Sequence, residues 1–396
     1  MHNVAAYPMS YSLAAAPPRG GLGTYLRAGS LAIWMFTLVF RYWWISDWYA
    51  LQEQFEAGVN VRAYYYLGFA VAFAAHLTLG ISAWFALPFT VTSTWSGRLF
   101  TLFCVLMFLA SPLSQVPRSS ALYSAATWGV YALLCLYWQG DYRIVQRMTV
   151  FAGIVVLAWL FVLLFKHGLT LGFGGVIGGI NRNTTATAAL GAMICCVLSP
   201  TKKVRWAAIA AGIVMAVIVS SRGSMVAMVA FFAVYYTIQK GTFKAALYAF
   251  GALAAATAVL LASPTLQHIV FEDILHVHDK ARGIGSGFTG RWELWQQGLE
   301  AFWDRPILGY GFRATTHGGG FGGVHSGYIK ILIETGFVGA ILVIAAVIVE
   351  MVRRFRLGIS FRDLPPAAAP GIDVVETARI NAVVCGTLAM TLVIWV

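Results

Sequence analysis

Four arginines occupy positions that would suit a bound anion. Arg222 lies in a short polar turn between two apolar runs. Arg291 opens a helical pattern, where a cation and the unpaired N–H groups of a helix N-terminus together suit a phosphate. Arg182 and Arg41, beside other apolar runs, are weaker candidates for the same role. The alternatives are an Arg222 that snorkels to a membrane interface and an Arg291 that is simply a solvated loop residue.

His325 is the candidate for proton transfer. It directly precedes Ser326 and an apolar run that begins at Ile329. A histidine exchanges a proton near neutral pH, so it could activate a hydroxyl group, a role that accelerates a reaction by about 10²- to 10⁴-fold. The alternative is a structural histidine with satisfied hydrogen bonds, and His317 in the same glycine-rich stretch is a competitor.

A second pair of titratable residues follows at once. Lys330 and Glu334 are four residues apart, so on a helix we expect them to pair with each other. Glu334 as a proton acceptor is the alternative.

The sequence predicts neither a metal site nor a cofactor. Its five cysteines all fall inside apolar runs without the spacing of ligands. His276 and His278 form a His-Val-His pair, but no third ligand is evident. The chain also has no phosphate-binding P-loop and no Gly-x-Ser-x-Gly elbow.

The composition predicts that the protein is embedded in a lipid bilayer. Of the 396 residues 59% are hydrophobic and only 11% are charged, which a soluble domain could not match without exposing apolar surface. The net charge of +12 does not indicate nucleic acid, because the basic residues gather in short loops between apolar runs. We therefore expect an all-α polytopic membrane protein that contacts membrane lipids and does not bind nucleic acid.

Apolar runs of the length needed to cross about 30 Å of hydrocarbon recur along the chain. They predict about eleven transmembrane helices, at residues 29–47, 64–90, 98–113, 120–138, 148–166, 183–199, 206–221, 224–239, 244–262, 327–351 and 376–396. We expect an N-terminal membrane bundle of about nine helices over 1–262, a loop over 263–326 and the last helices over 327–396. The chain ends inside an apolar run, which is compatible with a twelfth span in a longer chain.

The distribution of charge predicts which way the bundle faces. Lys and Arg residues are more frequent in the loops that share a side with the N-terminus, among them Lys202, Lys203, Arg205 and Arg353. By the positive-inside rule this side is cytoplasmic, and the long loop over 263–326 is periplasmic. We therefore predict a multi-pass protein of the bacterial inner membrane with its candidate site facing the periplasm.

The long loop is predicted to be partly helical. Its apolar residues recur at spacings of three and four opposite polar ones, the pattern of an amphipathic helix that could lie on a membrane surface. The apolar positions are Trp292, Trp295, Leu299, Phe302 and Trp303.

In its motifs and their order, the chain resembles the superfamily of bacterial O-antigen ligases and polysaccharide polymerases. The resemblance covers about residues 180–350 and is carried by Ser221-Arg222-Gly223, Gly290-Arg291-Trp292, Gly309-Tyr310-Gly311-Phe312, His325-Ser326-Gly327-Tyr328 and Glu334-Thr335-Gly336-Phe337-Val338-Gly339. Family members often have asparagine after the histidine, where this chain has Ser326.

The resemblance implies a metal-independent glycosyl transfer, with inversion, from an undecaprenyl-diphosphate-linked glycan to an acceptor hydroxyl. Arg222 and Arg291, with Arg182, would bind the diphosphate and stabilise charge on the leaving group, while His325 would activate the acceptor. Our first expectation is an O-antigen ligase whose acceptor is the lipid A core oligosaccharide. A polymerase that uses the same donor is the alternative, and a lipid-linked glycan flippase or another transporter is the alternative of a different class.

Overall fold

The computed structural model describes Gly29 and residues 91–140, 142–167, 176–177, 180–219, 221–268, 270, 291–316, 326–365 and 373–394. Apart from Gly29, the two spans expected at 29–47 and 64–90 lie outside the described residues.

The described part is almost entirely helical. Its α-helices are α5 (Trp95–Leu109), α6 (Pro117–Gly140), α7 (Tyr142–His167), α8 (Arg182–Val197), α9 (Lys202–Val219), α10 (Arg222–Lys240), α11 (Thr242–Ala262), α12 (Pro264–His268), α13 (Arg291–Asp304), α14 (Gly327–Asp363) and α15 (Val374–Ile394). Two 3-10 helices, η3 (Ser111–Leu113) and η6 (Ala314–Thr316), accompany them.

One pair of short strands accompanies the described helices. Strands β1 (Val176–Ile177) and β2 (Ile180–Asn181) form an antiparallel pair, in which Val176 faces Asn181 and Ile177 faces Ile180. The sequence places Gly178 and Gly179 between them, and a Gly-Gly pair is typical of a two-residue hairpin connection. The pair leads directly into Arg182 at the start of α8.

Every span expected from residue 98 onward coincides with a described helix. Within the described part, two helices are long and apolar enough to cross a membrane by length and composition, Gln146–Lys166 of α7 and the whole of α14. Trp95–Leu109 and Thr185–Val197 are apolar but shorter. The prediction of about eleven crossings therefore stays a prediction.

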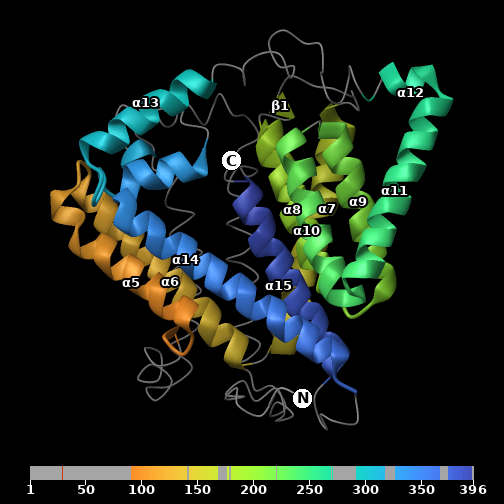
Figure 1. Cartoon of the computed structure of the whole chain (residues 1–396), viewed down its shortest axis with the longest axis horizontal. Coiled ribbons are helices and arrows are strands. Elements are labelled where there is room, and N and C mark those ends of the chain that lie inside the picture. The colour runs from red at the N-terminus through yellow and green to blue at the C-terminus, as the bar shows by residue number, and fades with distance from the viewer. Residues whose placement is uncertain are drawn as a thin grey trace.

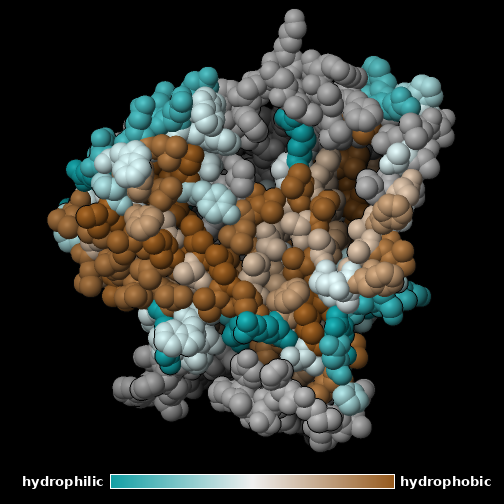
Figure 2. Space-filling model, in the orientation of Figure 1, coloured by the Kyte–Doolittle hydropathy of each residue, from teal (hydrophilic) through white to brown (hydrophobic). Residues whose placement is uncertain are grey.

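The surface of the molecule agrees with a membrane environment. Figure 2 shows apolar surface across the middle of one face, over α5, α14 and the helices beside them, with hydrophilic surface gathered at both ends. Exposed apolar side chains are abundant on these helices, for example Leu109 on α5 and Phe250 on α11. Because water would disfavour so much exposed apolar surface, we conclude that the chain is a membrane protein.

Small residues bring the helices close together. A Cβ atom added to Gly153 of α7 would lie 2.6 Å from the carbonyl oxygen of Ala192 on α8. One added to Gly386 of α15 would lie 2.9 Å from the ring of Phe231 on α10. Helices in membranes associate through such close contacts, since the lipid offers no hydrophobic drive between them.

The helices form two groups joined by α14 and α15 (Figure 1). One group holds α5, α6 and α13, and the other holds α7 to α12. Helix α14 runs diagonally across the molecule, packs against α5 on one side and α15 on the other, and α15 packs against α10. Helix α13 lies across one end of the bundle.

Candidate functional site

Three of the four arginines predicted to bind phosphate are the first residue of a helix, and Arg41 lies outside the described residues. Arg182 begins α8, Arg222 begins α10 and Arg291 begins α13. The expected start of a span at residue 224 was two residues late, so Arg222 belongs to the first turn of α10 rather than to the turn before it. The backbone of each arginine therefore belongs to the first turn of a helix, where N–H groups without intrahelical partners form the positive end of the helix dipole.

The three helix starts share one end of the bundle. Successive helices alternate in direction: α9 returns to the end of the bundle where α8 begins, so α10 begins at that same end (Figure 1). Helix α11 also returns to that end before α12. Helix α13 lies across this end too. The structure thus brings the backbones of Arg182, Arg222 and Arg291 to one end of the bundle.

The first turns of α8 and α10 contain no acidic residue that would offset these cations. The side chain of Ser221, which precedes Arg222, does not cap the first turn of α10; its hydroxyl lies 3.1 Å from that of Ser224, and both serines are buried. Of the three helices that begin with these arginines, α13 has an acidic residue in its first turn, Glu293. The N-terminus of a helix is in general a favourable place for a bound anion.

Arginines at the opposite end of the bundle are arranged in the reverse way. Arg205 donates to the carbonyl oxygen of Ser199 at 2.8 Å, and Arg379 donates to that of Leu198 at 3.2 Å, both just beyond the end of α8. Arg362 donates to the carbonyl oxygen of Thr237 at 3.2 Å, in the last turn of α10. These hydrogen bonds satisfy carbonyl oxygens near the ends of α8 and α10. Arg362 and Arg379 also pair with the carboxylates of Asp363 and Glu376, and Arg205 itself lies in the first turn of α9.

A second part of the candidate site is a turn docked into a break in α14. Gly336 has φ 64° and ψ −172°, which interrupts the helix. The chain that follows α13 fills the interruption: the backbone N–H of Phe337 donates to Pro306 at 2.7 Å, and that of Tyr310 donates to Ile333 at 2.9 Å. The motifs Gly309-Tyr310-Gly311-Phe312 and Glu334-Thr335-Gly336 are therefore two sides of one contact.

Glycine is required on the turn as well as in the helix. Gly309 has φ +68°, and a Cβ atom there would lie 2.5 Å from the carbonyl oxygen of Ile333. Gly311 has φ +113°, and a Cβ atom there would overlap the side chain of Ser114, which donates to the carbonyl oxygen of Tyr310 at 3.0 Å. The turn is thus held between α14 and the segment after η3.

Glu334 is the most deeply buried ionisable residue of this contact, with 2% of its surface exposed. Its carboxylate accepts a hydrogen bond from the hydroxyl of Thr315, and the amine of Lys330 lies 4.0 Å away. The expected pairing of Lys330 with Glu334 is confirmed. The sequence had not indicated Thr315, because its partner lies 19 residues away on another element.

Aromatic and basic side chains complete the turn. The hydroxyl of Tyr310 donates to Asp304 at 3.3 Å, and the guanidinium of Arg305 lies 5.0 Å from the centre of its ring. Burial, and then the neighbouring Asp304 carboxylate, raise the pKa of Tyr310, so its hydroxyl stays protonated and acts as a donor. Arg313 lies over the ring of Tyr123 at 4.8 Å. Sequence reasoning identified Tyr310 as part of a motif but missed its partners Asp304 and Arg305. It also missed Arg313, although this residue directly follows the Gly-Tyr-Gly-Phe motif.

His325 and its competitor His317 lie outside the described residues. Ser326, the next residue, is buried and is the N-cap of α14. The hydroxyl of Tyr328 donates to the carbonyl oxygen of Leu392 at 2.6 Å, which ties the first turn of α14 to the end of α15. The backbone position just after His325 is therefore fixed at the end of the bundle where the three helix-start arginines lie.

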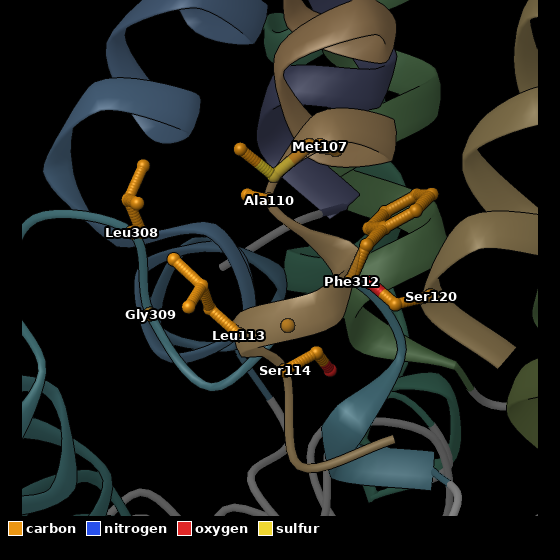
Figure 3. Close-up of a pocket in the computed structure, with 9 residues that line it drawn as sticks. Met107, Ala110, Leu113, Ser114, Ser120, Leu308, Gly309 and Phe312 are labelled. Atoms are coloured by element: carbon orange, nitrogen blue, oxygen red, sulfur yellow. The ribbon is translucent and has the colours of Figure 1, made fainter. Parts of the chain in front are cut away.

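A small recess lies beneath the docked turn (Figure 3). It lies between α5, η3 and the turn, and its lining contains Met107, Leu113, Ser114, Ser120 and Phe312. No charged side chain lines it, so the recess is not a candidate site for a diphosphate.

Within the part of the chain that the structure describes, no group of three or more His, Cys, Asp or Glu side chains is arranged to hold a metal ion. The His276 and His278 pair lies outside the described residues.

Residues 207–344 match the family described as O-antigen ligase. Over these residues the chain is similar to O-antigen ligases, which supports the resemblance to the O-antigen ligase and polysaccharide polymerase superfamily. The matched segment contains Arg222, Arg291, His325 and the docked turn with Glu334, whereas Arg182 precedes it. No curated protein matches the chain.

Proposed function

We propose that the protein transfers a glycan from undecaprenyl diphosphate to the lipid A core oligosaccharide at the periplasmic face of the bacterial inner membrane. The observation that carries the proposal is the opposite placement of arginines at the two ends of the bundle. At one end Arg205, Arg362 and Arg379 donate to backbone carbonyl oxygens, and at the other Arg182, Arg222 and Arg291 are the first residues of helices, whose N-termini favour a bound anion. The diphosphate of the donor is the anion that the family's chemistry would place there.

The positions of the arginines also support the proposed orientation. The arginines on the carbonyl side, Arg205, Arg362 and Arg379, belong to the loops that the positive-inside rule assigns to the cytoplasm. The helix starts at Arg182, Arg222 and Arg291 lie at the other end, which supports a site that faces the periplasm.

The proposed reaction forms one bond and breaks one. The oxygen of the acceptor hydroxyl attacks the anomeric carbon of the lipid-linked glycan, His325 accepts the hydroxyl proton, and the bond from that carbon to the diphosphate oxygen breaks. The diphosphate leaves with the electron pair. Arg222 and Arg291, with Arg182, stabilise its developing charge. Since the donor is already activated, the proposal requires no nucleotide and no metal ion.

The docked turn supports the proposal indirectly. Helix α13, which begins at Arg291, is joined through the turn to α14, which begins just after His325. The turn therefore connects the end of the helix that begins at Arg291 to the helix that follows His325. A polymerase that extends the lipid-linked glycan would use the same groups, so it is the second candidate function. A flippase is the candidate of another class.

Lysine at either of two arginine positions is expected to impair transfer. Arg222→Lys and Arg291→Lys each keep the charge but lose the planar pair of donors that matches a phosphate. If one charged hydrogen bond of about 1.5–3 kcal/mol is lost, the rate should fall about 10- to 100-fold. The measurement is the initial rate of glycan transfer in proteoliposomes, together with the affinity for the lipid diphosphate.

Arg205→Lys, the same substitution at the other end of the bundle, is the control and should leave transfer unchanged. If Arg222→Lys and Arg291→Lys both keep the wild-type rate and donor affinity, the result would favour a snorkelling Arg222 and a solvated Arg291 instead.

Deletion of the gene should distinguish the three functions. Loss of a ligase leaves long glycan on undecaprenyl diphosphate and uncapped lipid A core, because polymerisation precedes the missing step. Loss of a polymerase leaves core that bears a single repeat unit, since a separate ligase still acts. Donor trapped on the cytoplasmic face would indicate a flippase. The measurement is electrophoretic analysis of the lipopolysaccharide and of the lipid-linked glycan.

Reconstitution tests the proposal directly. Purified protein, lipid-linked glycan and lipid A core should give ligated product without nucleotide and in the presence of a chelator. Complete inhibition by the chelator, with recovery on adding a divalent ion, would contradict the metal-independent reaction.

A further inference from the structure

Helix α13 has three faces rather than the two of an ordinary surface helix. One face is buried and contains Gly298, Ala301 and Phe302, of which Ala301 and Phe302 pack in a cluster with Tyr310 and Ile333. A second face is exposed and polar, and it holds Glu293, Gln297, Glu300 and Asp304. The buried face fixes the helix to α14 and to the docked turn, so the direction of the other faces is set by the fold.

The third face is exposed and apolar. Trp303 exposes 71% of its surface, Trp292 56% and Leu299 42%. At 100° per residue these three positions fall within an arc of about 40°, between the buried and the polar faces. Two tryptophans and a leucine in one exposed stripe are disfavoured in water, whereas Trp is enriched at membrane interfaces.

The stripe continues onto the surface of α14. Ile307, four residues beyond Trp303, is 67% exposed, and the backbone N–H of Val338 donates to its carbonyl oxygen at 3.3 Å. Phe337 beside it is 58% exposed. From Phe337 the exposed face of α14 runs on through Ile341, Ile348 and Val352, along a helix long and apolar enough to cross a membrane.

The stripe therefore joins the apolar belt of the molecule. In Figure 2 the hydrophilic rim over α13 lies directly above the apolar surface over α5 and α14, without a polar zone between α13 and that surface. The lipid that surrounds the apolar surface of α5 and α14 would therefore also contact the exposed apolar face of α13.

We propose that α13 is an interfacial helix that rests on the lipid leaflet at this end of the bundle. Trp292, Leu299 and Trp303 enter the boundary between headgroups and acyl chains, and the acidic face points to water. The contact is apolar rather than electrostatic, because the polar face carries Glu293, Glu300 and Asp304 and would not attract an anionic lipid. It should therefore form on zwitterionic lipid and resist salt.

The contact would set the height of Arg291 above the membrane. Twelve residues separate Arg291 from Trp303, about 18 Å along the helix, so the tilt of α13 decides how close the arginine comes to the headgroups. This consequence rests on the proposed function, since a diphosphate attached to a membrane lipid lies at headgroup level. The membrane contact itself does not depend on glycan transfer.

Depth measurements with a fluorescent probe test the contact. The full chain with Trp303→Cys, labelled with a nitrobenzoxadiazole probe, is placed in phosphatidylcholine vesicles that carry nitroxides at known depths. Glu300→Cys, on the exposed polar face of the same helix, is the matched control. The unsubstituted chain is labelled in parallel, because Cys104, Cys196 and Cys385 are buried while Cys135 and Cys195 are partly exposed.

The probe at 303 is expected about 5–10 Å below the headgroup boundary, while the probe at 300 lies in water. The difference should persist in high salt. Equal, aqueous positions for the two probes would overturn the proposal. A probe at 303 that is shielded from lipid nitroxides and from an aqueous quencher would also overturn it, because another part of the chain or a second copy would then cover the stripe.

A functional comparison separates this inference from the proposed function. Trp303→Glu should lift the probe at position 299, introduced as Leu299→Cys, toward water, whereas Trp303→Phe should not.

If the wild-type protein transfers no glycan but the depths are as expected, the proposed function fails and the interfacial helix stands. If the protein transfers glycan but both probes lie in water, the interfacial helix fails and the proposed function stands.

Discussion

Gly336→Ala is expected to destabilise the protein by about 3 kcal/mol or more. The backbone at Gly336, with φ 64° and ψ −172°, lies in a region that is almost restricted to glycine, at a cost of about 1–3 kcal/mol for other residues. An added Cβ atom would overlap the carbonyl group of Ile307. The turn would have to withdraw, and with it hydrogen bonds such as that from Phe337 to Pro306, each worth about 0.5–1.5 kcal/mol.

Thermal unfolding of the purified protein in detergent measures this effect, and the rate of glycan transfer should fall with it. Gly251→Ala is the matched control. It lies within α11, where a Cβ atom would meet nothing within 4 Å, and alanine favours a helix over glycine by about 1 kcal/mol. An unchanged melting temperature for Gly336→Ala would mean that the turn is not locked into the break.

The break in α14 at Gly336 could not be predicted from the sequence. The helices from residue 98 onward were predicted because apolar runs of sufficient length leave the backbone no partner but itself. The run over 327–351 satisfies the same criterion and gave no sign of an interruption. Its cause lies in the turn after α13, whose backbone takes over the hydrogen bonds of Ile333 and Phe337. A pattern within one segment cannot reveal a partner from another.

The candidate site was predictable to a similar degree. The pairing of Lys330 with Glu334 follows from helical spacing and is confirmed, whereas the hydrogen bond from Thr315 to Glu334 depends on tertiary packing. The start of α13 at Arg291 was predicted from the change in periodicity. The start of α10 at Arg222 was not, because hydropathy does not distinguish the last residue of a turn from the first residue of a helix.

The charge pattern of the sequence predicted that Arg205 and Arg222 lie on opposite sides, but it did not predict their partners. Arg205, Arg362 and Arg379 donate to carbonyl oxygens near the ends of α8 and α10, and these contacts depend on tertiary packing. Hydropathy and charge counts treat all four arginines as loop cations.

His325→Ala is expected to lower the rate of glycan transfer by about 10²- to 10⁴-fold, the usual contribution of a general base. The protein should still fold and insert, because the position after His325 is held by backbone and by other side chains. Ser326 is the buried N-cap of α14, and Tyr328 is bound to Leu392 of α15 at 2.6 Å. Losing the imidazole removes none of these contacts.

The measurement is the initial rate in proteoliposomes that contain equal amounts of inserted protein, with donor affinity determined in parallel. Donor affinity should stay near that of the wild type, because the arginines and not His325 hold the diphosphate. His317→Ala is the control from the same glycine-rich stretch and should be much milder. A wild-type rate for inserted His325→Ala would remove the histidine from the mechanism. A severe loss with His317→Ala alone would transfer the role of base to that residue, and the proposed part of the arginines would stand in either case.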